Sequence, residues 1–300
     1  MQQYFINKKI FEGNISKASS ASVSDALVGN KRYDKTNIEG VRFELSTFAN
    51  ISFREAKISS SSFQHCVFMD CYFRNAEIST VDFTGTKFIN CNFNKTRIRH
   101  SEFDYCEFKN SVIPFEELQP NFPPEHNLRR YLCRNLKVEC RASGALSQYL
   151  KYFYAEMAAV EEHIKNIVFS SASYYKKYSF SDKIGAFFKL CELKLSKKAW
   201  GYGERLIPVA WISLVLAPLF FGICYWFLQG DSGFVVNEEI VRINFPQAVH
   251  FSYANLLNLN IGHMLSNSVW IRALEGFEAL LRAVLLGVLV AVLYRKIDRR

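Results

Sequence analysis

Apolar residues recur at every fifth position along a long N-terminal stretch of the chain, from Ile38 to Ile113. A small or β-branched residue stands two positions before each of them, and the other three positions of the repeat are mostly polar. Neither an α-helix nor a flat strand keeps a five-residue period on one side for this length. The chain must turn a corner once per repeat, which predicts a solenoid. The apolar positions are Ile38, Phe43, Phe48, Phe53, Ile58, Phe63, Phe68, Phe73, Ile78, Phe83, Phe88, Phe93, Ile98, Phe103, Phe108 and Ile113.

A second period of twenty residues sets the number of repeats in each coil. Ile replaces Phe at Ile38, Ile58, Ile78 and Ile98, and similar polar residues follow the same step at Asn50, Asp70, Asn90 and Asn110. Like residues separated by twenty are expected to stack on neighbouring coils, so each coil holds four repeats and has four sides. The sixteen repeats then give four coils, about 19 Å tall at a strand spacing of about 4.8 Å.

These repeats resemble the pentapeptide-repeat family, whose pattern is a small residue, a polar one, a central Leu or Phe and two variable positions. The resemblance covers residues 36–115 and implies an all-β, right-handed quadrilateral β-helix. Residues 1–35 are expected to cap its first coil, because an uncovered coil would leave an unpaired strand edge. The pattern lapses at Glu116, and three prolines between Gln119 and Pro124 end the stack.

A helical linker is predicted over residues 116–205. Apolar residues recur there at spacings of three and four, from about Asn127 to Lys165 and again from Lys183 to Lys198, as in amphipathic helices. Ser143 and Gly144 are start signals for the first long helix. Lysines and tyrosines around Tyr174–Tyr178 are typical of a belt near a membrane surface.

Residues 206–300 are predicted to form a membrane domain that crosses the bilayer twice. Leu206–Leu228 has no charged residue in 23 positions, which is about 35 Å of helix against a hydrocarbon core of about 30 Å. Ala283–Tyr294 is a weaker second span, with Glu275, Glu278 and Arg282 just before it.

Charge supports two crossings. Six Lys or Arg residues lie in Lys183–Arg205 and four in Arg295–Arg300, but only Arg242 and Arg272 lie between the spans. Positive flanks on both sides place both termini in the cytoplasm. No signal peptide is expected at the N-terminus, so the protein is predicted to reside in a bacterial inner membrane.

The membrane domain resembles the two-transmembrane potassium-channel pore, with an outer helix, a re-entrant half-helix at Gln247–Leu257, a filter and an inner helix. The motif Trp200-Gly201-Tyr202-Gly203-Glu204-Arg205 and the segment Leu274–Arg295 carry the resemblance. It implies a homotetramer around a central pore. Glu278, Arg282 and Gly287 become the hinge or pore-lining positions of the inner helix, and Gly287 also suits a close packing contact.

The resemblance departs at the filter, where the ion pathway is expected. The family's Thr-Leu-Gly-Tyr-Gly-Asp falls on Asn258, Leu259, Asn260, Ile261, Gly262 and His263, and only the Leu and the second Gly survive. Asn260 is the best non-glycine substitute for a positive φ angle. His263 in place of the acid, and Arg282 where a small residue is expected, weaken cation attraction, so potassium selectivity is not expected. His263 is either a loop histidine at the membrane surface or part of a pH-sensitive mouth.

Charge and cysteines exclude several other functions. The net charge of +9 is concentrated beside the apolar segments, while the repeats carry nine Lys or Arg against nine Asp or Glu. A neutral rod suits neither a DNA mimic that protects gyrase nor a DNA-binding surface.

Four cysteines occupy the small inward position of the repeat, which favours packing over metal binding: Cys66, Cys71, Cys91 and Cys106. Cys71 and Cys91 should stack, but a cytoplasmic location keeps thiols reduced.

We therefore predict an ion-channel-like membrane protein with a cytoplasmic β-helix for sensing or for docking an unidentified protein. The lipid bilayer and three further copies of the chain are its other partners, and nucleic acid is not one. No catalytic arrangement, cofactor or metal site is expected. The alternative is a non-conducting membrane scaffold that uses the β-helix as an interaction platform.

Overall fold

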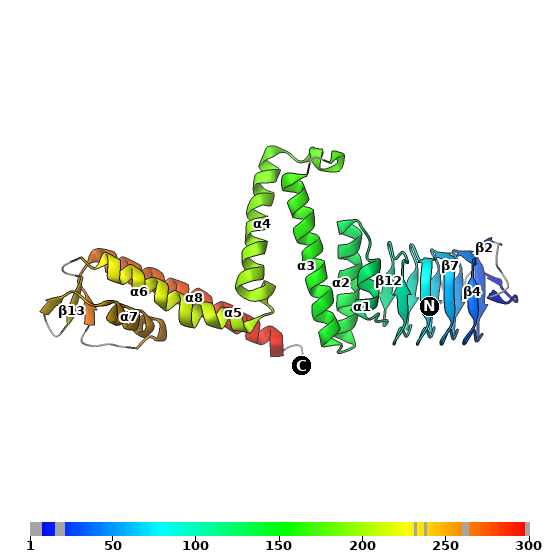
Figure 1. The fold of residues 1–300 in the computed structure, drawn as a ribbon, viewed down its shortest axis with the longest axis horizontal. Coiled ribbons are helices and arrows are strands. Elements are labelled where there is room, and N and C mark those ends of the chain that lie inside the picture. The colour runs from blue at the N-terminus through cyan, green and yellow to red at the C-terminus, as the bar shows by residue number, and fades with distance from the viewer. Residues whose placement is uncertain are drawn as a thin grey trace. The chain divides into compact units, whose positions relative to one another are not determined.

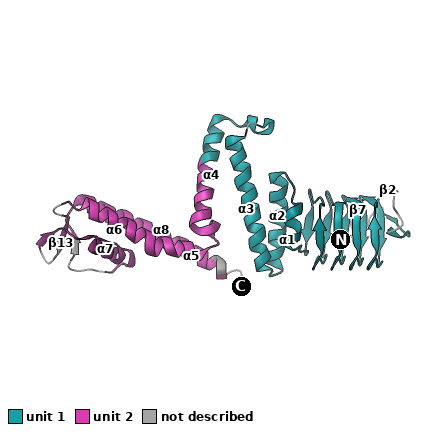
Figure 2. Ribbon diagram, in the orientation of Figure 1, with its two compact units in different colours: residues 1–187 teal, residues 188–300 magenta. Residues whose placement is uncertain are grey.

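The computed structural model describes residues 8–15, 22–170, 172–230, 233–236, 239–259 and 264–297. It divides into two compact units, Met1–Phe187 and Phe188–Arg300, which Figure 2 shows in different colours. Each unit has its own apolar cluster of buried side chains, and each is described separately.

The first unit begins with a β-solenoid of about five turns, seen in Figure 1 as a stack of parallel strands. Phe48, Phe68, Phe88 and Phe108 are direct partners on successive strands, which confirms the twenty-residue step. One sheet contains β1 (Lys9–Ile10), β3 (Ala26–Gly29), β6 (Thr47–Ala49), β8 (Val67–Met69), β10 (Lys87–Ile89) and β12 (Glu107–Lys109). The other contains β2 (Ser22–Ser24), β4 (Asn37–Glu39), β5 (Arg42–Glu44), β7 (Lys57–Gln64), β9 (Glu77–Asp82) and β11 (Arg97–Arg99).

The solenoid starts before Thr36 and therefore has about one turn more than the four coils predicted. Val23 pairs with Phe43 and Val28 with Phe48, each at the twenty-residue step. Val28 and Tyr33 are buried like the later Phe and Ile residues. The first coil escaped sequence analysis because Val and Tyr replace the Phe and Ile that mark the rest of the series.

Stacked phenylalanines fill the solenoid. The ring of Phe68 lies 4.6 Å from that of Phe48 and 5.4 Å from that of Phe88, with the planes within 12° of parallel. All three are at most 1 % exposed. Burying a side chain of this size contributes about 1.5–3 kcal/mol, so each ring of this column stabilises the solenoid.

Each corner of the coil is a residue with a left-handed backbone conformation. Every fifth residue from Asp25 to Asn110 has a φ angle between 47° and 70°, a region that favours Gly, Asn and Asp. This explains the recurrence of Asn and Asp at twenty-residue steps. Their side chains also bond between coils, from Asn50 to Asn30 at 2.8 Å and from Asn110 to Asn90 at 3.0 Å.

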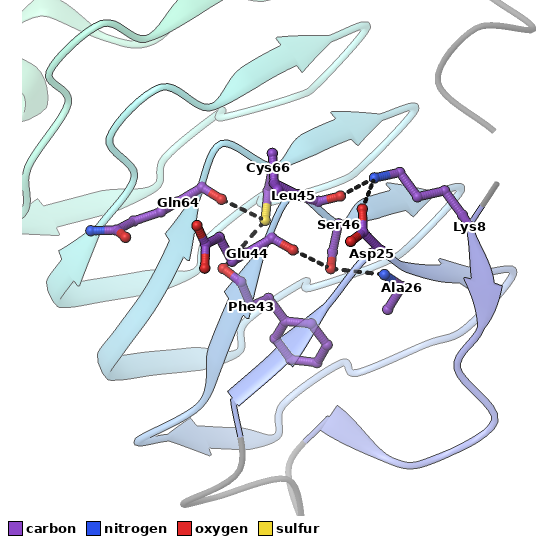
Figure 3. A network of polar contacts seen from close by, with 9 residues as sticks. All are labelled: Lys8, Asp25, Ala26, Phe43, Glu44, Leu45, Ser46, Gln64 and Cys66. Carbon is purple, nitrogen blue, oxygen red and sulfur yellow. Dashed lines mark hydrogen bonds and ion pairs between the residues drawn. The ribbon is translucent and has the colours of Figure 1, made fainter. Parts of the chain in front are cut away.

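Hydroxyls and thiols at the small inward position connect the coils (Figure 3). Ser46 Oγ accepts the N–H of Ala26 at 3.1 Å and donates to the carbonyl of Glu44 at 2.9 Å. One coil on, Cys66 Sγ lies 3.5 Å from the carbonyl oxygen of Phe43 on the preceding coil and 3.4 Å from that of Gln64 on its own. At the first coils, Lys8 Nζ contacts both the Asp25 carboxylate and the Leu45 carbonyl.

Helices close the far end of the solenoid. They are α1 (Phe115–Leu118), α2 (His126–Ala142) and α3 (Leu146–Phe169), with the short turn η3 (Gln119–Asn121) after α1. Asn135 accepts the N–H of Phe108 at 2.7 Å and donates to its carbonyl at 2.9 Å, as the next strand would. Tyr152 Oη donates to the carbonyl of Ile113 at 2.9 Å. Side chains from α2 and α3 thus protect the last strand edge.

The predicted linker is therefore partly solenoid cap. Leu132, Leu136 and Tyr152 belong to the same buried cluster as the phenylalanine column. The helices predicted between Asn127 and Lys165 are α2 and α3, which meet at Gly144, whose φ is 73°. The predicted start signals Ser143 and Gly144 thus lie just before α3. After them come η4 (Ser173–Lys177), α4 (Phe180–Trp200) and η5 (Gly201–Gly203).

The second unit contains two long apolar helices and a shorter helix between them in sequence. The first apolar helix is α5 (Leu206–Trp211), the π-helical turn η6 (Ile212–Leu216) and α6 (Ala217–Leu228). The π-helical turn precedes Pro218, which has no N–H to offer a regular helix. Next come β13 (Phe234–Val236), β14 (Glu239–Val241), α7 (Phe245–Leu257), β15 (Met264–Ser266) and α8 (Val269–Ile297). Leu206–Leu228 and Val269–Tyr294 are long and apolar enough to cross a membrane.

Candidate functional site

The short helix α7 lies against α6 and α8 of the second unit, as Figure 1 shows. A capping box begins it, in which Asn244 and Gln247 exchange side-chain-to-backbone hydrogen bonds. Asn258 ends it with φ 56° and ψ 36°, a left-handed C-cap. The predicted half-helix is thus confirmed as a helix, beginning at Phe245 rather than Gln247 because Asn244 supplies the N-cap.

A glycine sets the distance between α6 and α7. A Cβ at Gly222 would lie 2.8 Å from Cα of Val249 and 2.7 Å from its Cγ2, closer than van der Waals contact allows. Beside it, the ring of Tyr225 meets the ring of Phe251 edge-on at 5.2 Å. The first apolar helix therefore presents both a close-packing glycine and a large aromatic ring to α7.

A buried carboxylate joins all three helices. Glu278 of α8 is 3 % exposed, and its carboxylate accepts hydrogen bonds from Tyr225 Oη of α6 at 2.6 Å and from Ser252 Oγ of α7. Asn255 Nδ2 of α7 lies at 3.5 Å. The charge is satisfied by donors from α6 and α7, so Glu278 positions the short helix between the two long ones.

Arg282, one turn further along α8, contacts the end of α7. Its Nη1 donates to the carbonyl of Asn255 at 2.6 Å and lies 3.4 Å from Oδ1 of Asn258. The carboxyl end of a helix carries a partial negative charge, which a guanidinium stabilises. Glu278 and Arg282 therefore both act on α7, one on its side and one at its carboxyl end.

The structure describes only part of the predicted ion pathway. Asn258 caps α7, and Leu259 follows it with its side chain 60 % exposed. Asn260, Ile261, Gly262 and His263 lie outside the described residues. Gly287 lies on α8, and among the described residues no atom outside its own helix backbone lies within 4 Å of the Cβ position.

Sequence analysis missed the partners of Glu278. Tyr225, Ser252 and Asn255 are scattered over two apolar segments, and no local pattern links them. These partners could have been suspected from their polarity alone. Polar side chains within apolar segments of a membrane protein are usually paired with one another.

Replacing the buried carboxylate should loosen the second unit. We expect Glu278→Leu to destabilise it by about 2 kcal/mol, since the Tyr225 and Ser252 hydroxyls lose their acceptor in a buried place. Glu278→Gln, which keeps one acceptor oxygen, should cost less than half as much. Thermal unfolding of the full chain in detergent, followed by tryptophan fluorescence, measures this. Equal stability of the native and Leu proteins would contradict it.

The cysteines predicted to pack inside the solenoid are buried and free of disulfides. Burial raises the pKa of the Cys66 thiol to about 12 and raises that of Cys106. In the helical cap it raises the pKa values of Cys133 and Cys140 to about 12. Among the described residues, no group of three or more His, Cys, Asp and Glu side chains is arranged to hold a metal ion.

Alkylation should therefore distinguish the thiols. Burial keeps the Cys66 thiol largely protonated at pH 8, and the thiolate is the reactive form. We expect iodoacetamide to modify the exposed Cys191 within minutes and to leave Cys66 and Cys106 unmodified until the protein is unfolded. Peptide mass spectrometry follows each site, and rapid modification of Cys66 in the folded protein would refute this assignment.

A family model for the pentapeptide repeat region matches residues 18–113. This stretch is a pentapeptide-repeat region. The match begins before Thr36, in agreement with the extra coil. No curated protein matches the chain.

Several solved structures are similar over about a third of the chain. HetL, a pentapeptide repeat protein of heterocyst differentiation regulation from the cyanobacterium Nostoc, is 12 % identical over 33 % of this chain and 44 % of its own, with a TM-score of 0.23. The fluoroquinolone resistance protein QnrB1 is 21 % identical over 31 % of this chain and 47 % of its own, with a TM-score of 0.17. A pentapeptide repeat protein of the Arabidopsis thaliana thylakoid lumen is 21 % identical over 36 % of this chain and 74 % of its own, with a TM-score of 0.22. The chain thus spans less than half the length of HetL and of QnrB1.

Proposed function

We propose that the second unit is a two-span, ion-channel-like membrane domain and that the solenoid is an interaction platform attached to it. In this proposal four copies surround a central pore in a bacterial inner membrane. Both termini lie in the cytoplasm, and the solenoid is a right-handed quadrilateral β-helix that docks a protein. The observation that carries the proposal is α7, a short helix held by Gly222 and Glu278 between two helices of membrane-spanning length.

Exposure supports a membrane location for the two long helices. In the most apolar stretch of each, only 28 % and 11 % of the residues are buried within the chain, whereas the core helix of a soluble protein would be mostly buried. Large side chains such as Trp211, Phe227 and Leu280 are more than half exposed. A surface of this kind needs lipid or another subunit to cover it.

The polar residues of the second unit also suit a membrane. Charged side chains inside a bilayer face the protein interior and pair there, as Glu278 does with Tyr225 and Ser252. The concentration of Lys and Arg in Lys183–Arg205 and Arg295–Arg300 supports a cytoplasmic location for both ends of the helix pair.

One feature favours the second candidate, a scaffold that does not conduct. In a channel that attracts cations, the negative carboxyl end of a half-helix contributes to the attraction. Here the Arg282 guanidinium lies at that end of α7. Its positive charge offsets the negative end of the helix dipole, so this end attracts a cation less. Potassium selectivity is accordingly not part of the proposal, and a chain that kept the pore fold without permeation would have the same geometry.

Reconstitution separates the two candidates. The purified chain in liposomes should release entrapped potassium or chloride under an imposed gradient, and labelling of single introduced cysteines should place both ends on one side. Absence of flux for both ions, at acidic and neutral pH and under an applied voltage, would remove the channel and leave the scaffold. Ends on opposite sides, or release of the protein by carbonate, would refute the membrane domain itself.

A further inference from the structure

One face of the solenoid carries a groove that the proposed function does not explain. Two hollows of about 530 Å³ each lie along it, and both are lined by Tyr72 and Asn92. The two hollows adjoin at these residues, and together they extend over successive coils from Arg32 at one end to Gln148 of α3 at the other.

The end of the groove nearest the N-terminus is basic. Lys31, Arg32, Arg54 and Arg74 line it, against a single acid, Asp34. The Asp34 carboxylate is already engaged by Ser52 Oγ and by the N–H of Arg54 at 3.1 Å. Within the described part of the chain, the exposed side chains of Arg32 and Arg74 form no hydrogen bond or ion pair. The basic end thus has positive charge that its own coils do not neutralise.

On the rest of the solenoid surface, basic side chains are commonly paired with acidic ones. Elsewhere a cation commonly faces an acid one coil away, as in Lys35 with Glu55 at 3.6 Å, Lys87 with Glu107 at 2.9 Å and Arg97 with Glu77 at 3.4 Å. In the groove, Arg54 and Arg74 follow each other at the same position of successive coils. Arg54 is paired with its neighbour Glu55 at 3.2 Å, whereas Arg74 has no acid at this position on either neighbouring coil. Like charges on adjacent turns repel, so an anion lying across the two arginines would be attracted to this end.

The other end of the groove is uncharged and rich in amides. Asn90, Asn92, Asn94 and Asn110 line it together with Gln148. Asn110 already donates one N–H to Asn90 at 3.0 Å, but a side-chain amide has two N–H donors and an oxygen that accepts twice. The remaining donors and acceptors match those of a peptide backbone. The half-exposed ring of Tyr72 lies where the two ends meet and offers an apolar contact.

We infer that this groove binds an extended, carboxylate-rich segment of a partner protein. Its acidic part contacts Arg32, Arg54 and Arg74, and its backbone continues over the asparagines toward the helical cap. This inference rests on the proposed docking role of the solenoid and names the chemical class of the partner. A nucleic acid fits less well, because its phosphates continue along the whole strand whereas the basic side chains occupy one end.

Binding of a fluorescent hexaglutamate peptide tests the inference. The full chain in detergent, at low salt, should bind the peptide, and fluorescence anisotropy should show binding at least tenfold weaker for the double variant Arg54→Gln/Arg74→Gln. The matched control is Arg97→Gln/Arg99→Gln, which removes the same charge from another side of the same solenoid and should change binding less than twofold. Peptide binding does not depend on ion flux, so it is read separately from the channel experiment.

Three outcomes would overturn the inference. The first is no binding of hexaglutamate by the native chain at millimolar peptide. The second is an equal loss in both double variants, which would mean attraction by net charge alone. The third is tighter binding of a single-stranded hexanucleotide with the same dependence on Arg54 and Arg74, which would assign the groove to nucleic acid. Hydrogen exchange of β7 and β9 in each variant checks that the coils remain folded.

Discussion

Phe68→Ala is expected to destabilise the solenoid by about 3–5 kcal/mol, the usual cost of removing a fully buried aromatic ring. Phe68 lies at the middle of the stack and contacts the rings of Phe48 and Phe88 on the neighbouring coils. It also meets Phe63 and Phe73 edge-on in its own coil, at 5.5 and 5.6 Å. The cavity left by this ring would adjoin all four rings, and strands paired on both sides cannot move together to fill it.

Hydrogen exchange of the full chain in detergent measures this effect. Amides of β6, β8 and β10 should exchange more than a hundredfold faster in Phe68→Ala, since each 1.4 kcal/mol is about a factor of ten. Tyr105→Ala is the matched control, because it removes a ring that is 64 % exposed and should alter the free energy of unfolding by less than about 0.5 kcal/mol. Similar exchange rates in the two variants would show that the phenylalanine column does not hold the coils together.

Gly222→Leu is expected to separate α7 from α6. The added Cβ would lie 2.8 Å from a backbone atom of Val249, which cannot rotate away as a flexible side chain can. Overpacking of this kind costs about 1–3 kcal/mol, and here relief requires movement of a whole helix. We expect a loss of about 10 °C in the unfolding temperature of the second unit, and in the channel hypothesis a loss of ion flux as well.

The four tryptophans all lie at or after position 200, so their fluorescence reports on the second unit during unfolding. Trp226 also contacts Phe245 at the start of α7, with ring centroids 6.1 Å apart, and its emission should change when α7 moves. Gly276→Leu is the matched control, since no described atom outside the local helix backbone lies within 4 Å of the Cβ position at Gly276. An unfolding temperature as high in Gly222→Leu as in this control would contradict the packing described here.

The membrane hypothesis and the solenoid are independent of each other. The assignment of the solenoid rests on strand register and buried rings. The assignment of the membrane spans rests on helix length, composition and exposed apolar surface. In the channel hypothesis, Arg282 is the residue with the largest expected effect on a cation pathway, because its guanidinium lies at the carboxyl end of α7. Its contact with Asn255 also explains why a large cation stands in α8 where the channel resemblance predicts a small side chain.

Periodicity alone predicted the solenoid, its twenty-residue step and the inward position of four cysteines. Each coil offers the same environment at equivalent positions, so the same residue types recur there along the sequence. It failed at both ends. Val23, Val28 and Tyr33 form a coil without the marker residues, and Asn135 and Tyr152 close the last coil from helices that the pattern assigned to a linker. A cap occurs only once in the chain, so a method that looks for repeats cannot detect it.

In the second unit, hydropathy and length predicted the first long apolar helix. The second, weaker span was predicted with the help of the flanking charges, and the shorter helix with the help of the resemblance to a channel pore. The sequence did not reveal that Glu278 would be joined to Tyr225, Ser252 and Asn255, or that Arg282 would reach the end of α7. Those contacts link residues up to 53 positions apart. Only the tertiary structure brings them together, because a buried carboxylate takes whichever donors the packing of three helices places within hydrogen-bonding distance.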